Sequence, residues 1–146
     1  GLEKIAKPFY SQNKKNGLTT VLFFVDINKM KHINDNFGHL HGDLAVKTIA
    51  SCVMEAIPKT WLPIRYGGDE FLVVGNSKNY NGEDYCKIIT DLITKKTSIM
   101  QLPYNLSASI GSYSVLPTST LTLEEAVEKC DEVMYKVKEE YHKRMQ

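Results

Sequence analysis

A short turn between two strand-like runs constrains the fold of this chain more than any other feature. Its five residues are Gly67, Gly68, Asp69, Glu70 and Phe71. Two consecutive glycines allow a tight turn and a close approach of the backbone to a ligand. Strand-like runs lie on both sides of the turn, at residues 61–66 and 71–74. The sequence therefore predicts a β-hairpin that carries two carboxylates at its tip.

The composition is that of an ordinary soluble domain and argues against several classes of protein. The chain has 146 residues, of which 42% are hydrophobic and 24% are charged, and its net charge is +1. This balance gives no strong field that would attract nucleic acid or anionic lipid. The longest apolar run, residues 21–25, is too short to cross a bilayer. We therefore expect one domain that contacts neither nucleic acid nor membrane directly.

The cysteines indicate a reducing environment. Cys52, Cys86 and Cys130 are widely spaced and form no Cys-x-x-Cys pair. An odd number of cysteines without paired spacing argues against a disulfide framework or a zinc site. Each cysteine lies on the apolar side of a predicted helix, which favours a reduced thiol in the core. The sequence therefore predicts a cytoplasmic location.

Hydrophobic periodicity predicts the elements of the first half of the chain. Residues 2–11 fit a helix. The run Thr19–Ile27 is nearly continuous in apolar, β-branched and aromatic residues, which predicts a strand covered on both faces. After it, apolar residues at positions 30, 33 and 37 share one helical face, and Gly38 follows as a C-terminal cap. Asp43 is predicted to cap a second helix that ends near position 56.

The second half of the chain continues this alternation. The hairpin is followed by a helical apolar stripe at residues 85–93 and by alternating apolar residues at 106–110, which predict another strand. Thr122 and Glu125 form a capping-box pattern before a last helix. We therefore expect an α+β fold, a ferredoxin-like sandwich with a central, mostly antiparallel sheet flanked by helices. We also expect the helices to lie on one side of this sheet.

Two carboxylates are predicted to meet at one edge of the sheet. Asp26 ends the first strand and Asp69 lies at the hairpin tip, so the topology brings them side by side. Carboxylates and a backbone carbonyl can hold hard cations such as Mg²⁺, which in turn can grip a triphosphate. The alternative for a carboxylate here is a solvated group or a helix cap. Glu70 could instead pair with Arg65 or Lys31.

Asn34 and Asp43 flank the turn between the first two helices after the strand. An Asn carbonyl and an Asp carboxylate can accept hydrogen bonds from the ring nitrogen and amino group of guanine, a donor pair that adenine lacks. Such a pair would select GTP over ATP. The alternative is structural, because Asn34 could satisfy a helix end and Asp43 is a good N-cap. Lys31 and Lys138 are candidate phosphate partners, with solvated lysines as the alternative.

Several segments of the chain resemble the GGDEF family of diguanylate cyclases. Residues 65–71 look like the family signature, and residues 26–31 are similar to its Asp-x-Asp-x-Phe-Lys segment. The block from Asn34 to Asp43 matches the next family motif in its spacing. The resemblance extends to the later strand of the family, at residues 109–111, and to its last helix, at residues 131–138. The resemblance therefore covers nearly the whole chain in order.

The resemblance implies a palm-like nucleotide-cyclase fold and a specific reaction. Members of the family join two GTP molecules into cyclic di-GMP, a bacterial second messenger in signal transduction, and release two pyrophosphates. Each subunit of a homodimer holds one GTP. The ribose hydroxyl of each nucleotide attacks the α-phosphate of the other. The resemblance also implies that the reaction depends on Mg²⁺ or Mn²⁺.

The resemblance assigns roles to eight residues by their positions. Asp26, Asp69 and the backbone carbonyl of Ile27 would bind metal. Asp69, or a metal-bound water, would take the hydroxyl proton, and Glu70 would support the metal site as a second catalytic residue. The remaining residues would hold the nucleotide: Asn34 and Asp43 the guanine, and Lys31 and Lys138 the terminal phosphates.

The chain departs from the family pattern at several positions. Asn28 stands where the family usually has a second Asp, and Met30 where it has Phe. His142 stands where relatives carry an Arg that contacts phosphate, and a neutral His would grip phosphate less well. Residues 58–61 lack the Arg-x-x-Asp pattern that many relatives carry ahead of the hairpin. We therefore expect no product-inhibition site.

Three functional hypotheses follow from these residues. The first is an active cyclase: a single GGDEF domain, residues 1–146, excised from a longer protein whose fused sensory or membrane regions bring two subunits together. Such a fragment would be weakly active by itself, and cytoplasmic even if its parent protein is anchored in a membrane. The second is a catalytically weak or inactive GTP-binding regulatory module, favoured by Asn28, Met30 and His142. The third is a cyclase with a mixed purine product, against which Asp43 argues.

Overall fold

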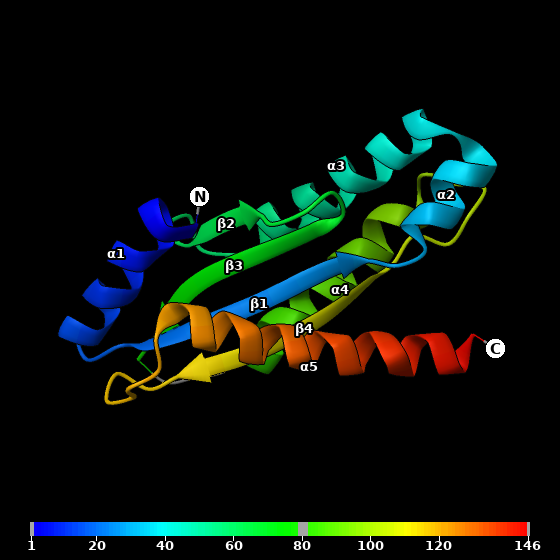
Figure 1. The fold of residues 1–146 in the computed structure, drawn as a ribbon. Helices are drawn as coiled ribbons and strands as arrows, with labels where there is room; N and C mark the ends of the chain where they lie inside the picture. Colours follow the sequence, from blue (N-terminus) through cyan, green and yellow to red (C-terminus); the bar gives the residue numbers. More distant parts are fainter. Residues whose placement is uncertain (1, 79–81, 146) are drawn as a thin grey trace.

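Figure 1 shows a twisted antiparallel sheet with helices packed against it. The computed structural model describes residues 2–78 and 82–145 of the chain. Within those residues the sheet has the strand order β2-β3-β1-β4, and every pairing is antiparallel. The predicted α+β fold with a mostly antiparallel sheet is therefore confirmed. The strands are β1 (Thr19–Ile27), β2 (Leu62–Arg65), β3 (Glu70–Ser77) and β4 (Ala108–Val115).

Helices cover both faces of the sheet, so the expectation of helices on one side is wrong. Helices α1 and α5 pack on one face, and α3 and α4 pack on the other (Figure 1). The physical reason lies in β1, whose nine residues are all buried and which therefore needs a cover on each face. The helices are α1 (Leu2–Lys15), α2 (Met30–Phe37), α3 (His39–Ala56), α4 (Gly82–Ser98) and α5 (Leu123–Arg144).

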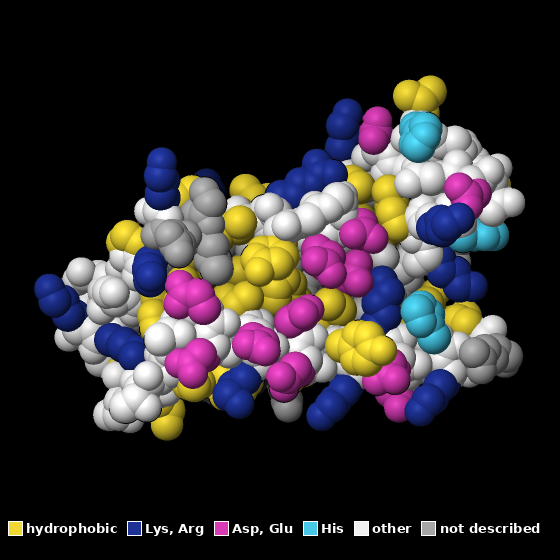
Figure 2. All heavy atoms as spheres, in the orientation of Figure 1, with side chains coloured by type: hydrophobic (Ala, Val, Ile, Leu, Met, Phe, Trp, Pro, Cys, Tyr) yellow, Lys and Arg dark blue, Asp and Glu magenta, His cyan; other side chains and the backbone are white. Residues whose placement is uncertain are grey.

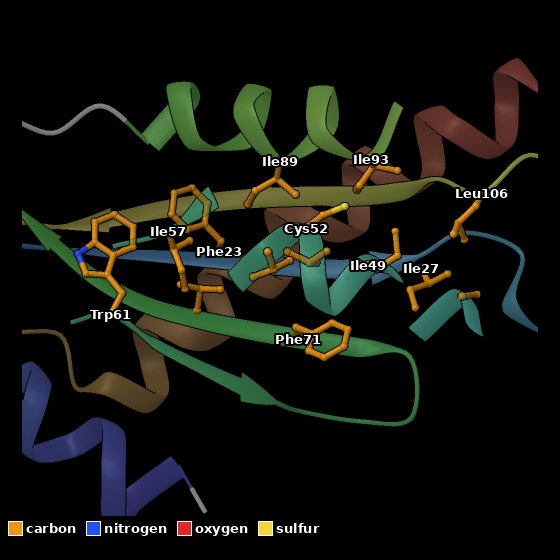
Figure 3. Close-up of a cluster of buried hydrophobic side chains, with 14 of the residues drawn as sticks. Phe23, Ile27, Ile49, Cys52, Ile57, Trp61, Phe71, Ile89, Ile93 and Leu106 are labelled. Atoms are coloured by element: carbon orange, nitrogen blue, oxygen red, sulfur yellow. The ribbon is translucent and has the colours of Figure 1, made fainter. Parts of the chain in front are cut away.

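The central strand β1 supplies side chains to two separate cores. Phe23 and its odd-numbered neighbours pack with α3 and α4, whereas Leu22 and Phe24 pack with α1 and α5. This division follows from the two-residue period of a strand. Figure 3 shows the first core, in which Phe23 and Phe71 of the sheet lie among side chains of α3 and α4. Burial of each such side chain contributes roughly 1.5–3 kcal/mol, so β1 is the rigid base on which the site rests.

The register between β1 and β3 places the hairpin tip at the end of β1. Asp26 lies opposite Glu70 in the sheet, and the Ile27 N–H donates to the Asp69 carbonyl at 3.0 Å. The hairpin between β2 and β3 is closed by a hydrogen bond from the Tyr66 N–H to the Glu70 carbonyl at 3.0 Å. The predicted hairpin is confirmed, and its carboxylates come to the end of the most buried strand.

A single residue, Gly38, separates α2 from α3. Gly38 has a φ of 88° and donates its N–H to the Asn34 carbonyl at 3.0 Å, which confirms the predicted C-terminal cap. The same glycine is the N-cap of α3, which begins at His39. Asp43 therefore lies inside the helix, and the prediction that it caps the helix is wrong. Its exposed carboxylate makes no hydrogen bond or ion pair with any other residue that the structure describes.

The last helix begins with the predicted capping box and packs very closely on β4. Thr122 Oγ1 accepts a hydrogen bond from the Glu125 N–H at 3.1 Å, and Glu125 Oε1 accepts one from the Thr122 N–H at 2.9 Å. Further along α5, a Cβ on Gly111 of β4 would overlap the backbone nitrogen and Cα of Met134. Gly111 therefore lets the helix backbone touch the strand, which fixes the position of Lys138 one turn further on.

The cysteines belong to the core, as the sequence predicts. Cys52 and Cys130 are buried, and no disulfide joins the three cysteines, all of which lie in the described part of the chain. Burial raises the pKa of the Cys130 thiol to about 12, so this thiol stays protonated. Among the described residues, no helix has the length and apolar character needed to span a bilayer.

Replacing Gly111 by Ala tests the close packing of α5 on β4. The added methyl group would meet helix backbone that cannot rotate away, so we expect the free energy of unfolding to fall by about 2 kcal/mol in urea denaturation. Ser112→Ala, on the next residue of the same strand, is the matched control and should change stability little. An unchanged urea midpoint for Gly111→Ala would contradict the packing described here.

Candidate functional site

Acidic side chains converge at the end of β1. Asp26 is only 8% exposed and lies opposite Glu70, and the backbone carbonyl of Asp69 accepts a hydrogen bond from the Ile27 N–H across the same strand pair. Asp131 of α5 lines a hollow of about 450 Å³ together with Asp26 and Glu70. Figure 2 shows acidic side chains gathered along the face formed by α5 and beside the hairpin. The strand ends that carry Asp26 and Asp69 are thus side by side, as the topology predicts.

A lysine from α5 reaches into this acidic group. The Nζ atom of Lys138 lies 2.9 Å from Asp26 Oδ2 and donates to the carbonyl oxygen of Ile27 at 3.1 Å. The other carboxylate oxygen, Asp26 Oδ1, is buried and has no hydrogen-bond partner among the residues that the structure describes. A buried polar atom without a partner carries a desolvation penalty of about 1–3 kcal/mol. The strand end therefore retains unused capacity to bind a cation.

Burial, together with neighbouring carboxylates, raises the pKa of both Asp26 and Glu70. Burial raises the pKa of Asp26, the hydrogen bond and charge of Lys138 lower it, and the charges of Asp69 and Asp131 raise it further. Burial also raises the pKa of Glu70, and the nearby charges of Asp26, Asp131 and Asp69 add to this effect. One ammonium group does not balance four carboxylates. A further cation at this place would be stabilised by the excess negative charge.

The chemistry of the donors suits a hard divalent cation. Among the described residues, no three His, Cys, Asp or Glu side chains are gathered into a ready-made metal cluster. The donor set is instead mixed: the orphaned oxygen of Asp26 and the backbone carbonyl of Ile27, with Asp69 on the adjoining strand end. Carboxylate and carbonyl oxygens are the ligands that Mg²⁺ and Mn²⁺ prefer. These residues therefore fit the metal that the sequence implies.

A second hollow lies on the other side of the hairpin tip, between the tip and helices α2 and α3. Its volume is about 510 Å³. It brings together four of the residues singled out from the sequence. One of them, Asp69, belongs to the hairpin tip that is bonded to the end of β1, so the hollow lies next to the acidic strand end. These four are Lys31, Asn34, Asp43 and Asp69.

The packing of α2 against α3 positions Asn34 within this hollow. The Asn34 side chain lies directly over Gly42 of α3, so closely that a Cβ on Gly42 would overlap the side-chain oxygen of Asn34. Asp43 is the next residue of α3 and lines the same hollow. The two polar groups are therefore held together on facing helices. A role as a helix cap does not explain Asp43, because this residue lies inside α3.

The basic residues near the hairpin tip have definite partners. Lys31 forms an exposed ion pair with Asp35 at 2.8 Å. Arg65 donates to the carbonyl oxygens of Gly67 and Gly68, at 3.3 Å and 2.7 Å, and thereby braces the tip. The alternative in which Glu70 pairs with Arg65 or Lys31 is therefore wrong. Sequence reasoning missed this bracing role of Arg65, although a donor two residues before a glycine turn was a signal for it.

Asn28 has a structural role that the sequence did not reveal. It is 2% exposed, its side-chain nitrogen donates to Ser107 Oγ at 2.9 Å, and its side-chain oxygen accepts from Ser109 Oγ at 2.7 Å. Asn28 thus ties the end of β1 to β4.

Asp131 was also missed, and its signal was its place on α5 seven residues, or two helical turns, before Lys138.

His142 occupies the place where the family pattern has an arginine. It lies on α5 four residues after Lys138 and lines the acidic hollow together with Asp26 and Glu70. An imidazole there cannot make the two parallel hydrogen bonds to a phosphate that the planar fork of a guanidinium makes.

Comparison with known proteins supports a single family. The family model described as diguanylate cyclase, GGDEF domain, matches residues 2–144. The chain is 27% identical to diguanylate cyclase DgcS of Shewanella oneidensis over 138 residues, which cover 89% of this chain and 45% of that protein. It is 27% identical to diguanylate cyclase DgcZ of Escherichia coli over 126 residues, which cover 84% of this chain and 41% of that protein. The chain thus spans less than half the length of these relatives.

Solved structures share the fold. The GGDEF domain of DgcB from Caulobacter crescentus, solved in complex with c-di-GMP, has a TM-score of 0.79 and 19% sequence identity, over 94% of this chain and 82% of that one. The active GGEEF domain of a diguanylate cyclase from Vibrio cholerae has a TM-score of 0.73 and 20% identity, over 92% of this chain and 86% of that one. With the family match over residues 2–144, these findings show that the chain belongs to the GGDEF family of diguanylate cyclase domains.

Proposed function

We propose that this chain is a diguanylate cyclase domain that joins two GTP molecules into cyclic di-GMP, depends on Mg²⁺ or Mn²⁺, and acts as a homodimer. The observation that carries the proposal is the position of the hairpin tip between two hollows. One hollow is lined by carboxylates and Lys138, and the other by Asn34 and Asp43. A nucleotide with its base in the second hollow can extend its phosphates toward the acidic strand end.

The second hollow suits guanine better than adenine. Asp43 offers a carboxylate that no other described residue engages, and Asn34 offers a carboxamide fixed over Gly42. The carboxylate can accept from the ring N–H and amino group of guanine, and adenine presents no such pair of donors. When the wrong substrate leaves a polar group of the site without a hydrogen-bond partner, the site discriminates strongly against that substrate. GTP is therefore the proposed substrate.

The acidic strand end supplies the groups for phosphoryl transfer. A divalent cation bound there would neutralise charge on the triphosphate and favour ionisation of the attacking hydroxyl. The Asp26 carboxylate and the Ile27 carbonyl would hold it, together with Asp69. The Asp69 carboxylate, directly or through water, would take the proton of the ribose hydroxyl. The new bond forms between that oxygen and the α-phosphorus, and the bond from the α-phosphorus to pyrophosphate breaks.

Ring closure requires two such domains. Each attack joins the hydroxyl of one nucleotide to the α-phosphate of the other, so two GTP-loaded sites have to face each other.

The Lys31–Asp35 pair is exposed, and such surface pairs contribute only about 0–1 kcal/mol. Lys31 can therefore leave Asp35 for a phosphate at little cost.

A second candidate function is a GTP-binding module without turnover. His142 favours it, because this side chain lines the acidic hollow in place of the arginine of the family pattern. Asn28 does not favour it, since both ends of its carboxamide are hydrogen-bonded to serines. Binding of GTP without any release of pyrophosphate would identify this second function.

Asp69→Asn tests the catalytic role of the hairpin tip. The amide cannot take a proton, so we expect cyclic di-GMP formation from GTP with Mg²⁺ or Mn²⁺ to fall by at least about 100-fold, measured by chromatography at high protein concentration. Asp91→Asn makes the same chemical change on the exposed face of α4 and should leave turnover unchanged. Equal product from Asp69→Asn and the parent chain would rule out this role.

Gly42→Ala tests whether Asn34 reads the base. The new methyl group would push the Asn34 carboxamide aside, so we expect GTP affinity to fall by about tenfold, the loss of one buried hydrogen bond, while the affinity for ATP stays low. Calorimetric titrations with both nucleotides measure this. The effect should not add to that of Asn34→Ala in the double variant, because both changes remove the same contact. Full additivity would show that Gly42→Ala acts elsewhere.

Glu70→Gln tests the electrostatic description through stability. The pKa of Glu70 is raised in the folded protein, so folding favours its neutral form and stability is lost as pH rises through the interval above the ordinary Glu value. Glutamine stays neutral, so in metal-free protein at pH 7 we expect Glu70→Gln to raise the melting temperature by roughly 1–2 °C. The gain should vanish below about pH 4, where Glu70 is also neutral. A gain independent of pH would contradict this description.

A further inference from the structure

The ammonium group of Lys138 contacts groups that are proposed to hold a metal ion. Its Nζ atom contacts Asp26 Oδ2 at 2.9 Å and the Ile27 carbonyl at 3.1 Å, which are two of the three groups proposed as metal ligands. A cation bound directly to oxygen lies at about 2.0–2.1 Å from each ligand in the case of Mg²⁺. A divalent ion that binds the Asp26 carboxylate and the Ile27 carbonyl would therefore lie close to this ammonium group, and the two like charges would repel each other.

We propose that Lys138 is an internal cation that holds the metal ligands of the metal-free protein in place and that a divalent ion has to displace. The inference rests on the proposed function, because it concerns the same site. Displacement frees the ammonium group for the nucleotide phosphates. Lys138 would thus be a positioning residue for the metal before it becomes a phosphate ligand.

Asp26 explains why an internal cation is needed. Its carboxylate is nearly buried and lies near three other acidic side chains. A buried charge strongly destabilises a fold when its counter-charge is removed. Lys138 is the ion-pair partner of Asp26 among the described residues. The ammonium group therefore keeps the carboxylate and the Ile27 carbonyl ordered in the absence of metal.

The anchoring of α5 allows the lysine to move without the helix. Met134, one turn before Lys138, is packed against Gly111 of β4, so the helix backbone is fixed. The flexible four-carbon stem of lysine can swing the ammonium group through the hollow that Lys138 lines with Glu139 and His142. Asp26 Oδ1, which accepts no hydrogen bond from any part of the chain described, stays available to the incoming ion. The exchange requires only a side-chain rotation.

The exchange couples metal binding to nucleotide binding. In the metal-free protein, Lys138 opposes the entry of the metal and is withheld from phosphate. Once the metal has entered, the freed ammonium group favours the nucleotide. Coupling of this kind is reciprocal, so GTP also strengthens metal binding beyond the contacts that its own phosphates make with the ion.

Titration of the nucleotide-free protein with Mn²⁺, followed by electron paramagnetic resonance, tests the proposal. Lys138→Met removes the competing ammonium group, and we expect this variant to bind Mn²⁺ about tenfold more tightly than the parent chain. Lys138→Arg keeps a cation at the site and should not gain affinity. Lys136→Met removes the same charge from an exposed position of α5 and is the matched control, with affinity expected to be unchanged.

The sign of the effect separates this role from a merely structural one. If Lys138 only stabilised the fold, its loss would weaken Mn²⁺ binding, and equal or weaker binding by Lys138→Met would overturn the proposal. An equal gain in Lys136→Met would overturn it too, because net charge would then explain the result. The titration contains no GTP, so absence of cyclase activity would defeat the proposed function while leaving this result intact.

A measurement on the parent chain covers the case in which Lys138→Met does not fold. Nuclear magnetic resonance of the lysine Cε–Hε groups reports the surroundings of each ammonium group. Addition of Mg²⁺ without nucleotide should shift the Lys138 signal and leave that of Lys136 in place. A Lys138 signal that does not move at saturating Mg²⁺ would mean that the ammonium group stays on Asp26, contrary to the proposal.

Discussion

The pairing of β1 with β3 is the constraint on which the rest of the structure depends. It sets Asp26 opposite Glu70 and joins Ile27 to the Asp69 carbonyl, so that residues more than forty positions apart in the chain form one acidic strand end. A shift of this register by one residue would turn every side chain of β1 to the other face. The two cores forbid such a shift, because β1 is buried on both sides. The hydrophobic pattern of one strand therefore fixes the geometry of the proposed metal site.

The same strand end is electrostatically unfavourable in the absence of a bound cation. Burial and neighbouring carboxylates raise the pKa of Asp26 and of Glu70, and a single lysine offsets part of the charge. Functional sites commonly hold groups that reduce the stability of the fold. Here the excess negative charge would attract a divalent ion, and the unpaired oxygen of Asp26 would serve as one of its ligands. The same carboxylates thus lower the stability of the metal-free protein and raise its affinity for metal.

Local patterns in the sequence predicted the elements well, and contacts between elements less well. The bounds of β1, the capping box at Thr122 and the hairpin were predicted because each depends on short-range periodicity or turn chemistry. Asp43 was wrongly placed at a helix start, since the sequence does not show that Gly38 alone turns the chain. The bonds of Asn28 to two serines and of Lys138 to Asp26 join residues about 80 and 110 positions apart, and no local pattern encodes them. The sequence therefore shows which side chains are candidates for the site, whereas the fold shows which of them contact each other.

We propose that the end of β1 and the hairpin tip share one divalent ion that holds a nucleotide. Anomalous diffraction at the manganese edge, from crystals grown with Mn²⁺ and a GTP analogue that cannot react, tests it most directly. We expect a manganese peak bound by the Asp26 carboxylate, the Ile27 carbonyl and Asp69, with the base between Asn34 and Asp43. A nucleotide bound elsewhere, or manganese absent from this strand end while Lys138 still contacts Asp26, would contradict it.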